Sequence, residues 1–249
     1  MDASLRKLVI IPTYNEKENI SNIIDAVMQL EGNFHVLIVD DGSPDGTANI
    51  VRQKQQSLSD RLFLKERSGK QGLGTAYIAG FKWGLERNYD YLMEMDADFS
   101  HNPGDLPRLI EACEQKGGDI AVGSRYVRGG KLVNWPLDRI MLSYGASLYV
   151  RLVTGMPVKD PTAGFVCYRS RVLSNMDLDK IRFVGYAFQI EMKFVARTLG
   201  FKIVEVPITF TDRQEGVSKM STNIVKEAIT GVLSMRWNQL TGGITRKNT

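Results

Sequence analysis

The chain has 249 residues, of which 43% are hydrophobic and 24% are charged. These ordinary proportions exclude collagen-like, disordered and coiled-coil proteins. Lys and Arg number 32 against 28 for Asp and Glu, which gives a formal charge of +4. Such an excess fits an ordinary solvated surface, and it also leaves phosphate-rich ligands or an anionic membrane surface open as partners.

No segment approaches 18 consecutive apolar residues, and residues 1–7 lack the apolar segment of a signal peptide. The sequence therefore predicts a cytoplasmic protein that can still associate peripherally with the cytoplasmic face of a membrane. Cys113 and Cys167 each stand in an apolar stretch. We interpret them as buried thiols rather than as a disulfide framework.

The first half of the chain alternates strand-like and helix-like segments. Continuous apolar runs, typical of strands covered on both faces, occupy 8–12, 34–40, 61–65, 91–96 and 119–124. Helical periodicity fills the intervals at 20–30, 47–56, 75–86 and 106–115. This alternation predicts a doubly wound, mainly parallel α/β sheet with helices on both faces. Ligands bind such sheets beyond the carboxyl ends of the strands, so the residues after each strand are the candidates for chemistry.

The second half is less regular. We expect a loop at 126–134, a helix at 138–153, a short apolar run at 164–169, a helix at 186–199, a strand at 202–206 and a last helix at 222–240. No repeat, low-complexity tract or linker divides the chain. The sequence therefore predicts a single domain over 1–249.

Two carboxylates stand one residue apart at the expected end of the fourth strand. Asp96 and Asp98 precede a loop that continues through His101. Both can turn toward one divalent cation, and Mg²⁺ is commonly held by one or two carboxylates plus substrate phosphates. The structural alternative is that Asp96 ends the strand and that Asp98 or Asn102 caps the following turn.

A second pair of acids, Asp40 and Asp41, follows the second strand. Asp45 or Thr47 would cap the next helix, and turn chemistry accounts for the glycines and the proline of 41–47. Two adjacent acids at the end of a buried strand still need at least one donor. A ribose hydroxyl, a base amino group or a metal would serve.

The segment 69–75 looks like a phosphate-binding glycine loop, but it matches neither the P-loop nor the dinucleotide fingerprint. Close helix packing and a tight turn are favoured for Gly72 and Gly74. The chain also lacks the nucleophile elbow of serine hydrolases, which argues against a covalent acyl-enzyme.

Six motifs, taken in order, resemble those of a known family. They are Ile11-Pro-Thr-Tyr-Asn-Glu16, Val39-Asp-Asp-Gly-Ser-Pro-Asp-Gly-Thr47, Gly72-Leu-Gly-Thr75, Met95-Asp-Ala-Asp-Phe-Ser-His101, Gly123-Ser-Arg-Tyr126 and Asp160-Pro-Thr-Ala-Gly-Phe165. Their order and spacing resemble the inverting glycosyltransferases of family 2, which have the GT-A fold, and more narrowly the dolichol-phosphate (polyprenol-phosphate) mannosyltransferases. The resemblance implies a metal-dependent enzyme, with Mg²⁺ or Mn²⁺, that transfers mannose from GDP-mannose to a polyprenyl phosphate.

The resemblance also implies a set of donor-site residues. Contacts to the nucleotide sugar fall to Pro12, Tyr14, Glu16, Val39, Asp41, Asp96, Ala97, Asp98, Arg125, Arg213 and Lys219. Of these, Asp96 and Asp98 would hold the metal, and the catalytic residues would be Asp98, Arg125, Arg213 and Lys219. Some relatives place a Gln two positions after the second Asp as a further metal ligand, whereas this chain has Ser100. Ser100 or water would then complete the ligand set.

Basic residues are also expected around a second phosphate. Arg139 and Ser143 lie four residues apart on an expected helix, hence on one face, and with Arg125 they could clamp the acceptor phosphate. Arg213 and Lys219 flank a glycine-containing loop able to fold over a bound nucleotide. The structural alternatives are a solvated helix face and an exposed hinge.

An acceptor phosphate is largely ionised at neutral pH, so no strong general base is required and catalysis rests on positioning and electrostatics. Three alternatives stay open: a polyprenyl-phosphate glucosyltransferase that uses UDP-glucose, a phospho-acceptor receiver domain, and a nucleotide-binding module without turnover. Nucleic acid is not expected as a partner, and the oligomeric state stays open.

The last helix carries an apolar stripe at helical spacing, formed by Ile224, Val225, Ala228, Ile229, Val232 and Leu233. Core or oligomer packing is one interpretation. The other is an amphipathic helix at a membrane interface, which Lys226, Arg236 and Trp237 favour.

Overall fold

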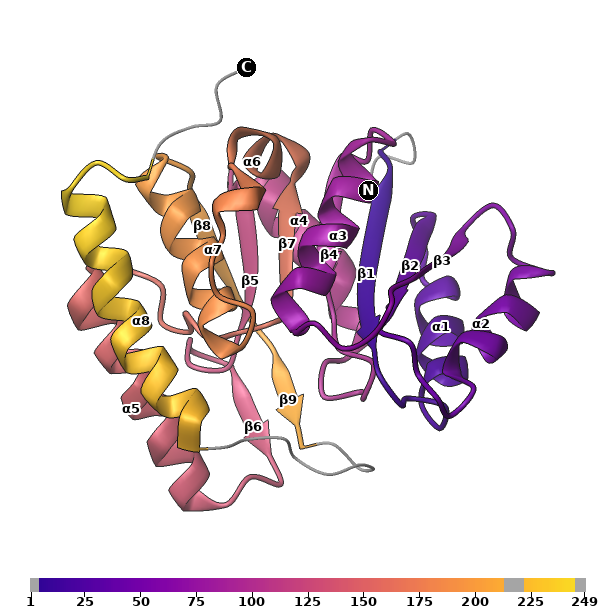
Figure 1. The fold of residues 1–249 in the computed structure, drawn as a ribbon, viewed down its shortest axis with the longest axis horizontal. Helices are drawn as coiled ribbons and strands as arrows, with labels where there is room; N and C mark the ends of the chain where they lie inside the picture. Colours follow the sequence, from indigo (N-terminus) through magenta and orange to yellow (C-terminus); the bar gives the residue numbers. More distant parts are fainter. Residues whose placement is uncertain (1–4, 213–221, 245–249) are drawn as a thin grey trace.

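The computed structural model describes residues 5–212 and 222–244. Within these ranges a seven-stranded sheet has the order β3-β2-β1-β4-β7-β5-β8 (Figure 1). Its strands are β1 (Lys7–Thr13), β2 (Phe34–Asp40), β3 (Leu62–Glu66), β4 (Tyr91–Glu94), β5 (Ile120–Ser124), β7 (Val166–Arg169) and β8 (Ile203–Pro207). Only β7 runs antiparallel to its neighbours, β4 and β5. The predicted doubly wound, mainly parallel sheet is therefore confirmed.

Helices cover both faces of the sheet. One face carries α1 (Ile20–Met28), α2 (Thr47–Gln55) and α4 (Leu106–Gln115), and the other carries α3 (Leu73–Leu85), α6 (Ser170–Asn175) and α7 (Tyr186–Thr198). The continuous apolar run of β1 serves both cores, because Val9 points into the first and Leu8 into the second.

Two further helices pack on the outside of α7, namely α5 (Leu137–Thr154) and α8 (Thr222–Leu240). They lie side by side in Figure 1. Val232 and Met235 of α8 are buried against α7, whereas Leu233, Trp237 and Leu240 are exposed. Core packing is thus confirmed for Val232. The side chains of 224–229 lie outside the described residues.

Several predicted boundaries differ from the structure. The fourth strand ends at Glu94, so Asp96 stands in the following loop. The run 164–169 forms the antiparallel strand β7. Two strands were not predicted: β6 (Lys131–Val133), inside the expected loop 126–134, pairs with β9 (Thr209–Thr211) as a second, two-stranded sheet. Three residues are too few for alternation to be read from sequence.

Two other predictions have clear outcomes. Cys113 and Cys167 are both free and buried, as expected. In the part of the chain that the structure describes, no helix has the length and apolar character needed to cross a bilayer.

Candidate active site

Parallel strands deliver the predicted residues to one edge of the sheet. β2, β1 and β4 are successive parallel neighbours, and β5 has the same direction because β7 is antiparallel to both β4 and β5. The segments that begin at this edge contain Tyr14, Asp41, Asp96 and Arg125. We call the loops after β1, β2, β3 and β4 the donor side, and the region from Arg125 into α5 the acceptor side.

Side-chain hydrogen bonds hold the donor-side loops. The Asp40 carboxylate accepts from the Thr13 hydroxyl (2.8 Å), the Ser43 hydroxyl (2.6 Å) and the Ser43 backbone N–H (2.9 Å). Asp45 accepts from the backbone N–H groups of Lys17 (3.1 Å) and Thr47 (3.0 Å). The N-cap of α2 is Gly46 rather than the predicted Asp45 or Thr47. Asp45 precedes this N-cap, accepts the N–H of the first helical residue, and joins the loops after β1 and β2.

The Asp41 carboxylate accepts a hydrogen bond from another side chain of the protein. Arg67, which follows β3, donates from Nε to Asp41 Oδ1 (2.6 Å) and from Nη1 to the hydroxyl of Thr75 on α3 (2.8 Å). Both side chains of the ion pair are only 9% exposed. The expected need for an external donor is thus met by Thr13 and Ser43 for Asp40 and by Arg67 for Asp41. The role of Asp41 toward a nucleotide stays a prediction.

Sequence reasoning missed Arg67, although its position after the third strand was the available signal. The other predicted donor-side residues differ in exposure. Pro12, Tyr14 and Glu16 are partly exposed, whereas Ala97 is buried and Val39 has no exposed surface. The Val39 side chain is therefore buried beneath this edge of the sheet and not exposed at its surface.

The glycine-rich segment 69–75 packs closely on the chain before and within α7. A Cβ on Gly74 would stand 2.6 Å from the ring of Phe188, and one on Gly72, where φ is +97°, would stand 3.0 Å from Val184. Close packing, as predicted for both glycines, is confirmed. The same segment places the Lys70 ammonium 5.3 Å from the ring centre of Tyr14.

The loop after β4 holds Asp96 and Asp98. Asp98 Oδ1 accepts the Ser100 backbone N–H (3.1 Å), which is the turn-capping contact considered above. Asp96 receives a long hydrogen bond from the Tyr77 hydroxyl (3.5 Å), and its Oδ2 lies 3.9 Å from His101 Nδ1. Phe99, the residue after Asp98, has φ +58°, which is unusual for a bulky residue and marks a strained turn.

His101 is buried and neutral. Its ring stacks on Phe165 with centres 5.0 Å apart. Burial lowers the pKa of His101 to about 4, because the charged ring would lose its hydration. His101 therefore packs in the floor beneath Asp96 as an uncharged ring.

The oxygen-bearing side chains of the loop after β4 fit a divalent metal that takes its other ligands from the substrate. Among the described residues there is no group of three His, Cys, Asp or Glu side chains arranged for a metal ion. Asp96 and Asp98 offer hard carboxylate oxygens, and the buried hydroxyl of Ser100 has no hydrogen-bond partner. Two carboxylates completed by phosphate oxygens and water are a common Mg²⁺ arrangement.

On the acceptor side, Arg125 forms a bidentate pair with Asp160. Its Nε and Nη2 donate to the two carboxylate oxygens (2.7 and 2.6 Å), and Nη2 also donates to Thr162 (2.8 Å). Asp160 is completely buried. Burial tends to raise its pKa, but the Arg125 hydrogen bonds and charge prevail and lower the pKa of Asp160 below 3.8. The pair fixes Arg125 at the end of β5.

The predicted acceptor residues gather at the start of α5. Arg139 donates from Nη1 to both carboxylate oxygens of Asp212 (2.9 and 2.8 Å), and its guanidinium lies 3.9 Å over the ring centre of Trp135. The Tyr126 hydroxyl donates to Ser143 (2.8 Å). Arg125 lies 5.7 Å from the same Trp135 ring. The structure thus brings Arg125 and Arg139 to one indole ring. Arg213 and Lys219 lie outside the described residues.

A buried cluster supports the segment 160–164 from below. Lys193 Nζ donates to the carbonyl oxygens of Ala163 (2.7 Å) and Gln189 (3.0 Å). Burial raises the pKa of Glu94 on β4 to about 8 and lowers the pKa of Lys193 to about 8, while the attraction between the two opposes both changes. Neither residue was singled out from sequence, because a lone Lys in an amphipathic helix gives no signal of burial.

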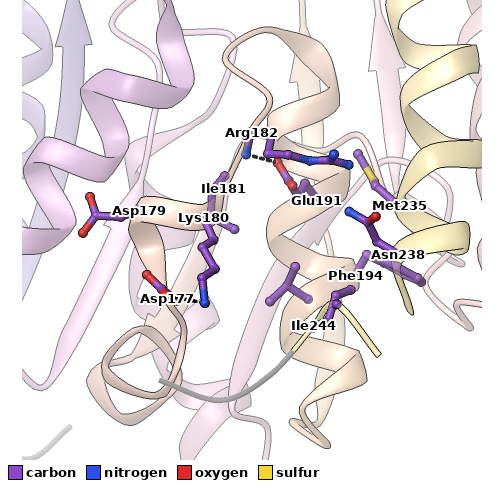
Figure 2. A pocket seen from close by; sticks show the side chains of 12 residues that line it. Asp177, Asp179, Lys180, Ile181, Arg182, Glu191, Phe194, Met235, Asn238 and Ile244 are labelled. Atoms are coloured by element: carbon purple, nitrogen blue, oxygen red, sulfur yellow. Dashed lines mark hydrogen bonds and ion pairs between the residues drawn. The ribbon is translucent and has the colours of Figure 1, made fainter. Parts of the chain in front are cut away.

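A separate pocket of about 300 Å³ lies between α7 and the end of α8 (Figure 2). Figure 2 shows Glu191 on its wall, where the carboxylate accepts the backbone N–H of Arg182 (2.9 Å). None of the residues that line this pocket belongs to the predicted site.

The model of the family described as "Glycosyl transferase family 2" matches residues 8–182, a range that holds both carboxylates, Arg125 and Arg139. The chain belongs to glycosyl transferase family 2. This family 2 chain is 49% identical, over 90% of its length and 84% of the relative's, to the polyprenol monophosphomannose synthase of Mycolicibacterium smegmatis. It is 48% identical, over 95% of its length and 98% of the relative's, to the undecaprenyl-phosphate mannosyltransferase of Micrococcus luteus.

Two solved structures share the fold of this family 2 chain. One is glucosyl-3-phosphoglycerate synthase from Mycobacterium tuberculosis with Mn²⁺, UDP-glucose and phosphoglyceric acid (TM-score 0.67, 15% identity, 96% of this chain and 81% of that chain). The other is a mannosyltransferase from Pyrobaculum calidifontis with GDP-Man and Mn²⁺ (TM-score 0.59, 16% identity, 97% and 66%). The expected GT-A-like fold is therefore confirmed.

Proposed function

We propose that this chain transfers mannose from GDP-mannose to the phosphate of a polyprenol, with inversion at the anomeric carbon. One observation carries the proposal: nearly the whole chain is 48–49% identical to two proteins whose names specify mannose and a polyprenyl phosphate. The arrangement of carboxylates on the donor side and arginines on the acceptor side supports it.

On the donor side we assign the diphosphate and its metal to Asp96 and Asp98. When bound there, Mg²⁺ or Mn²⁺ would neutralise charge on the departing diphosphate. The Tyr77 hydroxyl donates a long hydrogen bond to Asp96, the neutral His101 ring packs beside it, and the Ser100 N–H orients Asp98. The nucleoside would lie over the loops after β1 and β2, beside Tyr14 and Asp41.

On the acceptor side we assign the lipid phosphate to Arg139 and Ser143, with Arg125 between them and the donor. A phosphate oxygen attacks the anomeric carbon as the bond from that carbon to the diphosphate breaks, and GDP departs. A monoester whose second pKa is about 6 is already ionised at neutral pH, so no proton has to be removed. The protein contributes orientation and positive charge, to which we add Arg213 and Lys219 as aids to departure.

The assay that tests this proposal uses radiolabelled GDP-mannose and farnesyl phosphate, with Mg²⁺, with Mn²⁺ and with a chelator. We expect a mannosylated lipid that forms only with metal, and a β-linkage by NMR from the α-linked donor. A parallel assay with UDP-glucose tests the second candidate, which the shared fold of the UDP-glucose-bound synthase favours. Glucosyl transfer without mannosyl transfer would replace the first proposal by the second.

We further propose that the protein lies peripherally on a membrane, at the cytoplasmic face, through α5. Five large apolar side chains recur on this helix at spacings of three or four residues and are 42–78% exposed. They are Leu137, Met141, Tyr144, Leu148 and Leu152. Such a stripe suits an interfacial helix. Arg139 and Ser143 are on the same helix, so the lipid phosphate would be held beside the surface that contacts the membrane.

Flotation with phosphatidylcholine–phosphatidylglycerol vesicles containing polyprenyl phosphate tests this surface. We expect the native chain to float and the double variant Leu148→Glu, Leu152→Glu to stay in the dense fraction. Gln53→Glu, on the exposed side of α2, adds like charge elsewhere and should still float. A native chain that remains with the dense fraction would overturn the assignment.

A further inference from the structure

Aromatic rings form a continuous column between the two sides of the site. Trp135 meets Phe210 edge-on, with centres 5.4 Å apart and planes at 84°. Phe210 meets His101 edge-on at 5.1 Å and 79°, and His101 stacks on Phe165 at 5.0 Å and 10°. We call Trp135, Phe210, His101 and Phe165 the aromatic column.

Two rings of the column, Trp135 and His101, lie beside residues assigned to phosphates. At one end the Arg139 guanidinium lies 3.9 Å over the Trp135 ring. Further along, His101 Nδ1 lies 3.9 Å from Asp96 Oδ2. Arg125 lies alongside, 5.7 Å from the Trp135 ring centre and 5.5 Å from that of Phe210.

Backbone contacts fix the central ring. Phe210 is the middle residue of β9, opposite Leu132 of β6, and it forms an isolated bridge with His101. The next residue, Thr211, donates its N–H to the carbonyl of Ser100 (3.2 Å). The strand β9 is therefore attached both to the loop of Asp96 and to the segment that leads into Trp135.

We propose that Trp135 and Phe210 are positioning residues that set the spacing between Arg139 and the Asp96 loop. The inference rests on the proposed function, because it takes Arg139 as the acceptor-phosphate ligand and Asp96 as a donor ligand. The two phosphates must be held on opposite sides of one sugar, and a displacement of about 1 Å can cost about 100-fold in rate. Rigid rings suit this task, and a stacked guanidinium keeps its plane.

The experiment compares two tryptophans that carry the same kind of arginine stack. Trp83 on α3 lies 4.1 Å beneath the Arg87 guanidinium and also contacts Phe63, away from the predicted site. For Trp135→Leu we expect the KM for farnesyl phosphate to rise about tenfold while the Kd for GDP-mannose changes less than about twofold. Trp83→Leu should change neither, and Trp135→Phe should restore most of the acceptor affinity.

Phe210→Leu tests the middle of the column. Because Phe210 contacts both Trp135 and His101, we expect kcat to fall about 10- to 100-fold, with acceptor KM and GDP-mannose Kd both altered. Thermal unfolding of each variant shows whether it is folded. Both Trp135→Leu and Trp83→Leu lose the packing of an indole ring, so we expect their unfolding temperatures to drop equally. Only Trp135→Leu should also raise the KM for farnesyl phosphate.

Binding of farnesyl phosphate without donor, measured by calorimetry, separates the two levels of the proposal. A native chain that neither binds farnesyl phosphate nor transfers mannose would overturn the proposed function and this inference with it. A native chain that does both, with an unchanged acceptor KM in Trp135→Leu, would overturn only the positioning role. An equal loss of donor and acceptor affinity in Trp135→Leu would also overturn it, because that pattern indicates general disruption.

Discussion

The donor and acceptor sides of the site are stabilised by contacts of different kinds. On the donor side, each loop is held by several hydrogen bonds. Some are local, such as that from Ser43 to Asp40, three residues away, and others join different loops, such as those from Thr13 to Asp40 and from Arg67 to Asp41, 27 and 26 residues apart. On the acceptor side, the partners of the two arginines are distant in sequence: Arg125 and Asp160 are separated by 35 residues and Arg139 and Asp212 by 73.

This difference predicts how each side responds to substitution. A donor-side loop that is held by several hydrogen bonds should lose one of them and keep the others. The acceptor side depends on ion pairs and stacked rings that link distant segments. One substitution there should therefore alter the positions of several side chains. The predictions below can confirm or contradict that distinction, and they run from the largest expected effect to the smallest.

Asp98→Ala should give the largest loss of activity. The substitution removes one of the two carboxylates assigned to the metal and diphosphate, and loss of one preorganised electrostatic group commonly costs at least about 100-fold in rate. The measurement is the initial rate of mannosyl transfer across a Mn²⁺ titration. Asp179→Ala, an acid whose side chain is 77% exposed, is the control and should retain activity. Metal-dependent transfer at the native rate by Asp98→Ala would show that the assignment is wrong.

Asp160→Asn should produce the largest loss of stability. It leaves the Arg125 guanidinium, 9% exposed, without its counter-charge, and breaking such a buried pair costs about 3–5 kcal/mol. Urea denaturation measures the free energy of unfolding. Asp179→Asn, which breaks the exposed pair with Lys82, should cost less than about 1 kcal/mol. Equal losses in the two variants would contradict the stabilising role of the buried pair.

The same carboxyl gives a pH dependence with a definite sign. The pKa of Asp160 is lower in the folded chain than the ordinary value of 3.8. Its contribution to stability is therefore complete above about pH 4 and is lost as pH falls through the lowered folded pKa. The stability difference between the native chain and Asp160→Asn should shrink only below about pH 4. A difference that shrinks near neutral pH would point to another group.

The sequence predicted the donor side well because its signals are local. Long apolar runs define β1 and β2, and the rule that chemistry gathers at the ends of parallel strands places Asp41 and Asp96 at one edge. It missed Arg67, because the position of this arginine after the third strand does not by itself show burial against Asp41.

The acceptor side could be predicted only as separate residues. Arg139 and Ser143 share a helix face by spacing, but their partners come from distant segments. The three-residue strands β6 and β9 give no periodic signal, so the sheet that brings Phe210 to Trp135 had no counterpart in the sequence. Pairing between short distant segments is a tertiary effect, and local pattern does not encode it.

Arg139→Gln should affect one substrate selectively. The variant loses the guanidinium that lies on Trp135 and bonds Asp212, so the acceptor phosphate loses a charge-assisted donor. Such hydrogen bonds are worth roughly 1.5–3 kcal/mol, which corresponds to an increase of about tenfold or more in the KM for farnesyl phosphate. GDP-mannose affinity, from calorimetry, should stay within about twofold. Equal losses for both substrates would contradict separate sites for the two phosphates.

Arg67→Lys should have the smallest effect, confined to the donor side. A lysine keeps the positive charge beside Asp41, but a single ammonium cannot reproduce the two directed bonds to Asp41 and Thr75. We expect the Kd for GDP-mannose to rise only a few-fold, about 1 kcal/mol for one neutral hydrogen bond, with no change in acceptor KM. Arg52→Lys is the matched control, because its pair with Glu66 is exposed and should contribute nothing measurable. A raised acceptor KM in Arg67→Lys would show that a donor-side substitution also affects the acceptor side, and the distinction between the two sides would then fail.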